Sequence, residues 1–238
     1  MPDDGEPPLL PDAAVWLVRP GAGLLLDLDG TLLDSEPVHQ AVYREYFARR
    51  GWRVPADVRR QFSGRRGAEV FATLEGPWTG EDADKLTEEV LELLRGSPRR
   101  PEPVAGAVRL IAACVRVGLP TVIVTSAGLE WAVPALDVLG TERGALAMVT
   151  AEDCTSGKPD PEPFRRGVEL LGLRAETLVA VEDSPAGIAS ALGAGVGRVL
   201  GVTTTRGADE LLAAGATATA PDLVELARAV EALAAARG

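Results

Sequence analysis

The chain has 238 residues, of which 46% are hydrophobic and 25% charged, so it can bury a core and is neither disordered nor fibrous. Acidic residues outnumber basic ones by 35 to 24, and the resulting net charge of −11 argues against nucleic acid or an anionic membrane as the main partner. With two cysteines, an acidic N-terminus and no apolar run that approaches the length of a membrane span, we expect a cytoplasmic protein without a disulfide framework.

The N-terminal part of the chain predicts an extension followed by a buried strand. Residues 1–20 contain five prolines and several acids, which is typical of a loose segment. The run from Leu24 to Leu26 then leads into Asp27 and Asp29, as in a buried strand that ends in a polar turn. We therefore expect the core domain to begin at residue 21.

A helical domain is predicted for residues 35–103, with a helical pattern and no convincing strand between about residues 36 and 96. Apolar residues recur at helical spacing at Val38, Val42 and Tyr46, and again at Leu86 and Val90. Three prolines between residues 98 and 103 mark the end of this segment. Its first half, residues 35–66, carries eight basic against three acidic residues, which favours a surface that meets an anionic substrate.

From residue 104 onward, helical patterns alternate with short apolar runs. The runs at 120–125, 146–149, 177–181 and 198–202 are predicted strands, and a helical pattern precedes each of them. Such alternation is typical of a parallel sheet with helices on both faces. The predicted fold is α/β: a Rossmann-like, doubly wound parallel sheet core formed by residues 21–34 and 104–238, with an inserted α-helical cap domain at 35–103.

Polar side chains follow four of the predicted strands, at the edge where open parallel sheets bind ligands. These residues are Asp27 and Asp29, Thr125 and Ser126, Lys158, and Glu182 and Asp183. Each of them alone reads as a turn residue or a helix cap, but four strand ends that all carry such groups indicate a site. Lys158 is also one of only two lysines among the 24 basic residues.

This set of side chains suits the chemistry of a phosphate monoester. Asp27 and Asp183, with Glu182, can supply the hard oxygen ligands that Mg²⁺ prefers. Asp27 can attack phosphorus to form an aspartyl-phosphate, and Asp29 can protonate the leaving oxygen. Lys158 and the hydroxyl of Thr125 can stabilise charge on the phosphoryl oxygens, which completes a candidate phosphoryl-transfer site.

Four sequence segments resemble the four motifs of the haloacid dehalogenase superfamily in order and spacing, over residues 24–232. The segments are DLDGTLLDSE at 27–36, VIVTS at 122–126, GKPDP at 157–161 and VEDSPAGI at 181–188. The resemblance implies that Asp27 is the nucleophile and a metal ligand, and that Asp29 is the acid and base and also offers its carbonyl to Mg²⁺. It further implies that Thr125 and the backbone of Ser126 hold phosphate, that Lys158 bridges the nucleophile and the phosphate, and that Glu182 and Asp183 complete the metal site.

Within that superfamily the motifs favour one branch. The dehalogenases lack the second aspartate, so Asp29 favours a phosphatase or a phosphomutase. Thr125 lies 91 positions after Asp34, which leaves room for a helical cap, whereas Asp183 lies only 25 positions after Lys158. The sequence Glu-Asp-Ser at 182–184 resembles the β-phosphoglucomutase-like branch.

The segment FSGRRG at 62–67 lies where such relatives place a substrate-facing loop, although a solvated turn between helices is the alternative. The basic excess of residues 35–66 favours the first interpretation, so we expect Arg65 and Arg66 to bind the substrate phosphate. His39, the single histidine, is expected to support the site rather than to act in catalysis. Cys114 and Cys154 are expected to serve in packing.

The sequence therefore predicts a Mg²⁺-dependent phosphatase that hydrolyses a small phosphorylated sugar, polyol or hydroxy acid. A sugar phosphomutase with the same residues is the alternative, and a non-catalytic binding domain on the same scaffold is a third hypothesis. The expected partner is a small phosphate ester, with neither nucleic acid nor membrane. The oligomeric state stays open, with a monomer as the simplest expectation.

Overall fold

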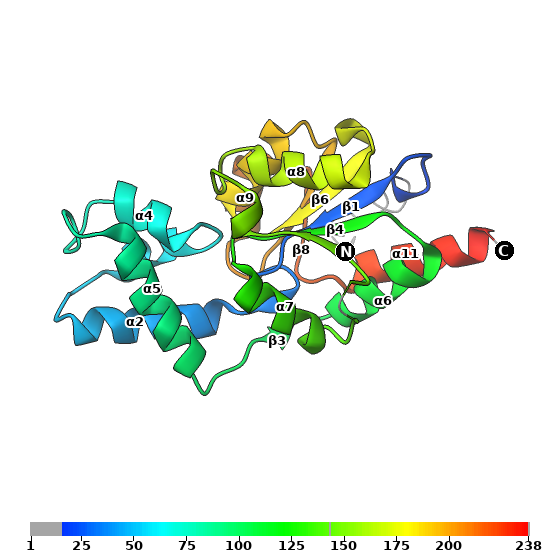
Figure 1. The fold of residues 1–238 in the computed structure, drawn as a ribbon. Coiled ribbons are helices and arrows are strands. Elements are labelled where there is room, and N and C mark those ends of the chain that lie inside the picture. The colour runs from blue at the N-terminus through cyan, green and yellow to red at the C-terminus, as the bar shows by residue number, and fades with distance from the viewer. Residues whose placement is uncertain (1–15, 143, 238) are drawn as a thin grey trace, which may run out of the picture.

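A computed structural model of the protein describes residues 16–142 and 144–237, and the side chains as far as residue 233 (Figure 1). Residues 1–15 of the predicted N-terminal extension lie outside the described part. Leu17, by contrast, is fully buried in the main core. The core therefore begins a few residues before the expected boundary at residue 21, because an apolar side chain in the extension finds a place under the sheet.

The core is built on a parallel sheet of six strands in the order β5-β4-β1-β6-β7-β8. The strands are β1 (Gly23–Leu26), β4 (Thr121–Val124), β5 (Ala147–Val149), β6 (Leu178–Glu182), β7 (Arg198–Val202) and β8 (Ala218–Ala220). Two further strands of two residues each, β2 (Leu33–Asp34) and β3 (Glu102–Pro103), pair antiparallel where the helical segment leaves and rejoins the core. The doubly wound parallel sheet predicted from the sequence is confirmed.

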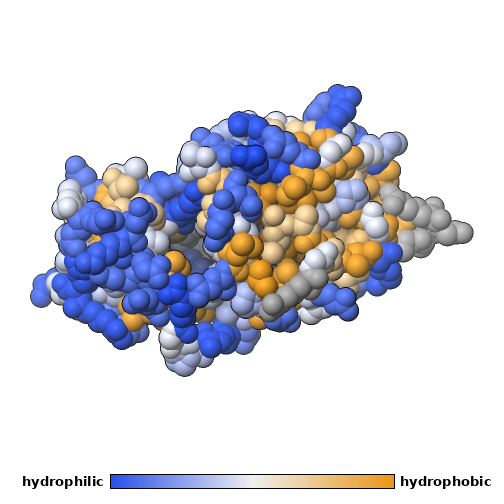
Figure 2. Space-filling view, in the orientation of Figure 1, coloured by the Kyte–Doolittle hydropathy of each residue, from blue (hydrophilic) through white to orange (hydrophobic). Residues whose placement is uncertain are grey.

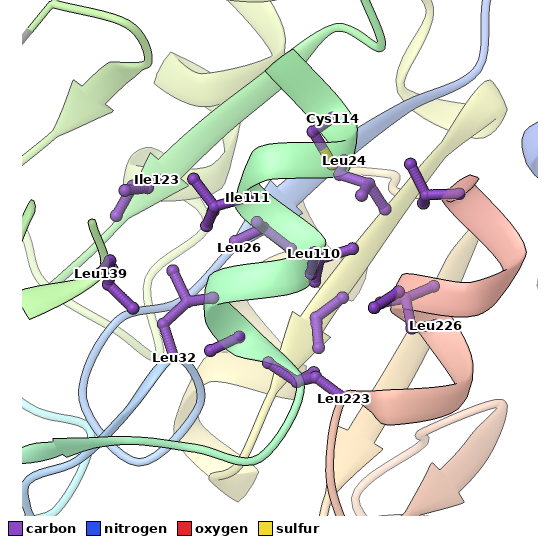
Figure 3. Packing of buried hydrophobic residues seen from close by; sticks show 14 of the residues in the cluster. Leu24, Leu26, Leu32, Leu110, Ile111, Cys114, Ile123, Leu139, Leu223 and Leu226 are labelled. Atoms are coloured by element: carbon purple, nitrogen blue, oxygen red, sulfur yellow. The ribbon is translucent and has the colours of Figure 1, made fainter. Parts of the chain in front are cut away.

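Helices cover both faces of this sheet (Figure 1). The helices α6 (Ala107–Val117), α7 (Leu129–Val138) and α11 (Val224–Arg237) cover one face, and α8 (Glu162–Leu171), α9 (Pro185–Gly193) and α10 (Ala208–Ala213) cover the other. Side chains of β1 alternate between the faces, as strand geometry requires: Leu24 and Leu26 enter the first cluster and Leu25 the second. Figure 3 shows Leu24 and Leu26 packed beneath Leu110 and Ile111 of α6.

Residues 35–103 form a helical segment, which we call the helical insertion, beside the core (Figure 1). Its elements are α2 (Glu36–Arg49), α3 (Ala56–Arg59), the 3-10 turn η1 (Arg60–Phe62), α4 (Gly67–Thr73) and α5 (Ala83–Gly96). These helices bury their own apolar cluster, in which Phe47, Phe71 and Trp78 pack ring against ring. The insertion thus has a core that is separate from the two clusters of the sheet.

The topology decides where a ligand can bind. Strand β1 pairs with β4 on one side and with β6 on the other, so the chain order reverses at β1. In open parallel sheets this reversal opens a crevice at the carboxyl ends of the strands.

Within residues 16–142 and 144–237, no helix combines the length and apolarity that a membrane crossing requires.

Candidate active site

The carboxyl ends of β1 and β6 bring three carboxylates together. Asp27 follows β1 directly, and its backbone N–H donates to the carbonyl of Val181 in β6 (3.0 Å). Glu182 is the last residue of β6, and Asp183 follows it. One oxygen from each of these three buried side chains lies within 4.8 Å of the others. The strand-end cluster expected from the sequence therefore forms.

Lys158 joins this cluster from the loop before α8 and is fully buried. Its ammonium donates to Asp27 Oδ1 (2.5 Å), to Glu182 Oε1 (2.6 Å) and to the carbonyl of Val124 (2.9 Å). These three contacts use all three N–H donors of the side chain. The cation is consequently held in one position between the two carboxylates.

The same cluster shifts the pKa values of its members. Burial raises the pKa of Asp27 to about 7, Lys158 opposes this rise, and the charges of Glu182 and Asp29 add to it. Burial, and then the charges of Asp27 and Glu182, hold the pKa of Asp183 well above its usual range. Burial alone would lower the pKa of Lys158, but the two carboxylates outweigh it and the pKa is raised. The cluster thus holds more negative charge than its single cation balances.

The residues present fit a divalent cation. Asp27 Oδ2 is buried and has no hydrogen-bond partner among the described residues, which is an expensive state for a carboxylate oxygen. The carboxylate of Asp183 lies beside it, and the charge of Lys158 does little to offset the burial and the negative neighbours that raise the pKa of Asp183. Glu182 is more fully engaged: its Oε1 accepts from Lys158, and its Oε2 accepts from the backbone of Asp183 (3.1 Å) and from the hydroxyl of Ser184 (3.0 Å). Hard oxygen donors of this kind suit Mg²⁺.

The surroundings of Asp183 include hydroxyl groups that the sequence analysis did not single out. The hydroxyl of Thr205 donates to the carboxylate of Asp183, and the hydroxyl of Thr31 lies 3.5 Å from Asp183 Oδ1. Gly30 has a φ of +88°, and a Cβ there would lie 2.1 Å from Asp183 Oδ2, so only glycine fits. Thr205 lies in the segment after β7, at the same edge of the sheet, so the rule that polar residues after a strand mark the site would have identified it.

Asp29 lies two residues beyond Asp27 and is contacted from both parts of the molecule. Its Oδ1 accepts from the indole N–H of Trp131 in α7 (2.9 Å). The same oxygen lies 4.0 Å from Nε2 of His39, which belongs to α2 of the helical insertion. His39 therefore lies beside the site, whereas Trp131 is a site residue that the sequence analysis missed, because an isolated tryptophan in a helix carries no motif.

Thr125 and Ser126 lie at the end of β4, next to this cluster. Thr125 is buried, and its hydroxyl accepts from the backbone N–H of Ala127 (3.0 Å). The hydroxyl of Ser126 donates to the carbonyl of Gly64 in the helical insertion (3.1 Å). Ser126 thus links the core to the insertion at the edge of the site.

The segment at residues 62–67 lies against the core, and its two arginines have different surroundings. Arg66 donates to the carbonyls of Ala151 (2.9 Å) and Cys154 (3.0 Å), so its guanidinium binds backbone of the core. The side chain of Arg65 forms neither a hydrogen bond nor an ion pair with any described residue, and its Nε is buried. The two residues were expected to act alike, but only Arg65 has a guanidinium without a protein partner.

A cavity of about 340 Å³ lies between the core and the helical insertion. Asp27, Asp29 and Asp183 line it from the core, and Arg65 and Leu94 are among the residues that line it from the insertion. Figure 2 shows the surface hollowed where the two parts meet. A small ligand in this cavity would therefore touch the carboxylate cluster and the insertion at the same time.

Gly64 allows the close approach of the insertion to the core. Its φ is +72°, and a Cβ there would lie 2.4 Å from the hydroxyl oxygen of Ser184. We expect Gly64→Ala to lower kcat/KM by about 10-fold or more, because the added methyl displaces the segment that closes the site. Gly51→Ala is the matched control, since Gly51 has a φ of +69° but nothing within 4 Å of a Cβ. Equal losses in both variants would show that backbone strain alone, and not the contact with Ser184, matters.

Comparison with known proteins agrees with this geometry. Residues 22–195 match the haloacid dehalogenase-like hydrolase family. The chain belongs to this family. The match covers β1, the helical insertion and the strands that carry the carboxylate cluster, so the resemblance of the four motifs is confirmed.

Individual relatives extend the comparison. The chain is 34% identical over 189 residues to validoxylamine A 7'-phosphate phosphatase of Streptomyces hygroscopicus subsp. limoneus, covering 79% of this chain and 88% of that protein. It is 32% identical over 176 residues to hexitol phosphatase A of Escherichia coli, covering 73% and 79%. The structure resembles a candidate β-phosphoglucomutase of Bacteroides vulgatus with a TM-score of 0.76 at 25% identity, covering 90% and 89%.

Proposed function

We propose that this haloacid dehalogenase-like hydrolase is a Mg²⁺-dependent phosphatase that acts on a small phosphorylated sugar, polyol or hydroxy acid. One observation carries the proposal: Lys158 holds Asp27 Oδ1 at 2.5 Å while Asp27 Oδ2 is buried without a partner, at the floor of a cavity that the helical insertion closes. The relatives named above, whose names state that they are phosphatases of small phosphorylated compounds, support the same reaction class.

In the first half of the reaction, the carboxylate of Asp27 attacks phosphorus and the bond from phosphorus to the ester oxygen breaks. Asp29, which lines the cavity, donates a proton to that leaving oxygen, so that an alcohol departs instead of an alkoxide. Lys158 from the loop before α8 and Thr125 at the end of β4 stabilise the charge on the phosphoryl oxygens. The product of this half is an aspartyl-phosphate on Asp27.

In the second half, a water molecule attacks the phosphorus of the aspartyl-phosphate. Asp29 now takes a proton from the water, and the bond between phosphorus and the Asp27 oxygen breaks. Inorganic phosphate leaves, and Asp27 returns to its carboxylate form. Asp29 has then given one proton and taken one, so the enzyme is restored.

Asp27 and Asp183 would hold the metal, with Glu182 and the backbone carbonyl of Asp29 as further oxygen donors. When bound, Mg²⁺ would neutralise charge between the attacking carboxylate and the phosphoryl group. Glu182 also accepts from Lys158 and from two backbone N–H groups, so its carboxylate holds Lys158 and the start of the loop after β6 in position as well.

The helical insertion is proposed to act as a cap that selects the substrate. Arg65 provides a guanidinium without a protein partner at the cavity wall, which suits an oxyanion or several hydroxyls on the substrate. Leu91 and Leu94 of α5 provide apolar wall for the C–H faces of a ring. This combination supports a phosphorylated sugar, polyol or cyclitol over a compact substrate.

The function is tested with a panel of phosphorylated sugars, polyols and hydroxy acids, assayed for phosphate release with Mg²⁺ and with EDTA. We expect phosphate release from at least one member, and its loss in EDTA. The metal site is tested separately by thermal unfolding, in which Mg²⁺ raises the Tm of the wild type and fails to do so in Asp183→Asn. Absence of phosphate release across the whole panel would contradict the proposal and favour a non-catalytic binding domain.

Arg65→Met is expected to raise KM for the best substrate by about 10-fold to 100-fold, because a hydrogen bond to a charged group contributes roughly 1.5–3 kcal/mol. The chemical steps do not use this side chain, so kcat should change much less. Arg44→Met is the control, since Arg44 is exposed on α2 of the same insertion and does not line the cavity. An unchanged KM in Arg65→Met would remove Arg65 from the binding site.

A sugar phosphomutase is the second candidate function, favoured by the structural similarity to the candidate β-phosphoglucomutase. It would use the same Asp27 and Asp29 but return the phosphoryl group to a sugar instead of water. Product analysis with a hexose 1-phosphate separates the two activities. Isomerisation faster than phosphate release would favour the mutase.

The two cysteines bear on the compartment in which the protein acts. Cys114 is buried and Cys154 half-buried, and both are free thiols, which supports action in a reducing compartment such as the cytoplasm.

A further inference from the structure

We infer that Trp131 is a positioning residue for Asp29, and that its indole N–H directs the acid proton of Asp29 to the oxygen that faces the substrate. The inference rests on the proposed function, because it concerns the acid and base of that reaction. It assigns a role to a residue outside the four motifs. Trp131 lies in α7, on the core side of the cavity that Asp29 also lines.

The contact between the two side chains is specific to one oxygen. The indole Nε1–H donates to Asp29 Oδ1 at 2.9 Å, whereas Asp29 Oδ2 forms no hydrogen bond with a described residue. The ring nitrogen Nε2 of His39 also approaches Oδ1, at 4.0 Å. Both neighbours of the carboxylate therefore lie on the same side, and Oδ2 remains available to a ligand in the cavity.

A hydrogen bond to one oxygen determines which form of the carboxylic acid is present. The indole nitrogen is a donor only and cannot accept a proton. An oxygen that accepts from an N–H is a poorer place for the acid proton than its partner, so Oδ2 is the oxygen left to exchange a proton with a ligand in the cavity. General acid catalysis requires the proton to face the leaving oxygen at hydrogen-bond distance. Trp131 thus favours the form of Asp29 that can donate to the substrate.

The start of α7 is itself held in place, which keeps the indole aimed at Asp29. Both carboxylate oxygens of Glu152 accept from the backbone N–H of Leu129, at 3.1 and 3.2 Å. The carboxylate of Glu152 lies close to Gly128 as well, 2.7 Å from the place that a Cβ there would take. From the other side, the ring of His39 lies 5.1 Å from that of Trp131, centroid to centroid. The indole is therefore fixed between the core and the helical insertion.

The first test compares esters that differ in their need for an acid. In Trp131→Phe, which keeps an aromatic ring but removes the N–H, we expect kcat/KM for the best alkyl phosphate of the panel to fall by about 10-fold to 100-fold, a part of the 10²–10⁴ that general acid catalysis contributes. For p-nitrophenyl phosphate, whose leaving group needs no proton, the loss should stay below about 3-fold. Equal losses on both esters would overturn the inference.

The second test asks whether Trp131 acts through Asp29. In the Asp29→Ala background, assayed with enzyme in excess on the same alkyl phosphate, adding Trp131→Phe should cause no further loss, because the group it positions is gone. An additional loss of the size seen in the single variant would assign Trp131 to substrate contact or to packing instead. Trp16→Phe is the matched control and should keep wild-type kcat/KM, since Trp16 packs against Arg19 and Arg198 outside the cavity.

A third readout does not depend on turnover. The chain has four tryptophans, so a ¹H–¹⁵N NMR spectrum resolves four indole N–H signals, and the one missing in Trp131→Phe is that of Trp131. Asp29→Ala should move this signal upfield and leave the other three in place, because the hydrogen bond to Asp29 is lost. A signal that stays in place would overturn the inference. Failure of the wild type to hydrolyse any ester would instead count against the proposed function.

Discussion

Asp27→Asn is expected to lower kcat for phosphate release by at least about 10⁴-fold, as loss of a nucleophile does in other enzymes that form a covalent intermediate. The amide has the shape of the carboxylate but lacks the charge that the proposed attack of Asp27 on phosphorus requires. Acid quenching of the reaction with a ³²P-labelled ester should trap a phosphoenzyme in the wild type and none in the variant.

The control for this variant is Asp57→Asn, which removes an exposed carboxylate from α3 of the helical insertion. It should retain wild-type turnover within about 2-fold, as surface substitutions away from special features usually do. Thermal unfolding of Asp27→Asn checks that the protein is folded. Phosphate release within 10-fold of the wild type would contradict the covalent mechanism, whatever the identity of the substrate.

Lys158→Met is expected to lower the free energy of unfolding by about 3–5 kcal/mol at pH 8 in EDTA, the cost of leaving buried charges without their partner. Lys158 is fully buried and contacts Asp27 and Glu182 at 2.5 and 2.6 Å. Without the ammonium, two carboxylates remain side by side in the interior. Urea denaturation measures the loss, and turnover should be lost as well.

The destabilisation should depend on pH in a defined direction. The pKa of Asp27 is about 7 in the folded protein against an ordinary value of 3.8, mainly because of burial. An acid whose pKa is raised by folding destabilises the folded state above its folded pKa, and this effect is lost as the pH falls toward the unfolded value. Lys158 opposes this rise in the wild type, so its removal should raise the pKa of Asp27 further and enlarge the destabilisation above that pKa. Relative to the wild type, Lys158→Met should therefore lose less stability at pH 5 than at pH 8.

Two further variants separate the charge effect from a simple loss of packing. Lys85→Met is the matched control, because Lys85 is the only other lysine and is exposed on α5. The free energy of unfolding of Lys85→Met should stay within about 0.5 kcal/mol of the wild-type value. The double variant Lys158→Met with Glu182→Gln should be more stable than Lys158→Met alone, because it buries one charge fewer. A double variant that is less stable would contradict the charge explanation.

The order of elements could be predicted from local patterns. Five of the six strands of the sheet lie at or within a residue or two of the predicted runs, because buried strands of a parallel sheet are continuous apolar segments. Strand β8 (Ala218–Ala220) escaped prediction, since alanine has little preference for strands and this segment pairs because β7 lies beside it. The catalytic motifs could be found because polar residues after apolar runs mark strand ends.

Contacts between distant segments could not be predicted in this way. Arg65 and Arg66 are neighbours in the sequence and both line the cavity, yet Arg66 donates to carbonyls of the core, whereas the guanidinium of Arg65 has no partner among the described residues. The link from Trp131 to Asp29 spans 102 positions. Thr205 reaches Asp183 only because β7 lies next to β6. Each of these contacts depends on how strands and helices are arranged, which no local pattern encodes.

The sequence by itself determined the fold class, the family and the residue types that the chemistry requires, because these depend on periodicity and on short motifs. Only the tertiary structure decided which of the many acidic residues come together at one place. It places Asp27, Glu182 and Asp183 within 4.8 Å of one another around a single buried lysine. Burial gives those charges their effect, because a carboxylate in water has neither a raised pKa nor a need for a cation. The net charge of −11 therefore matters for function at this one place, where the strand ends meet.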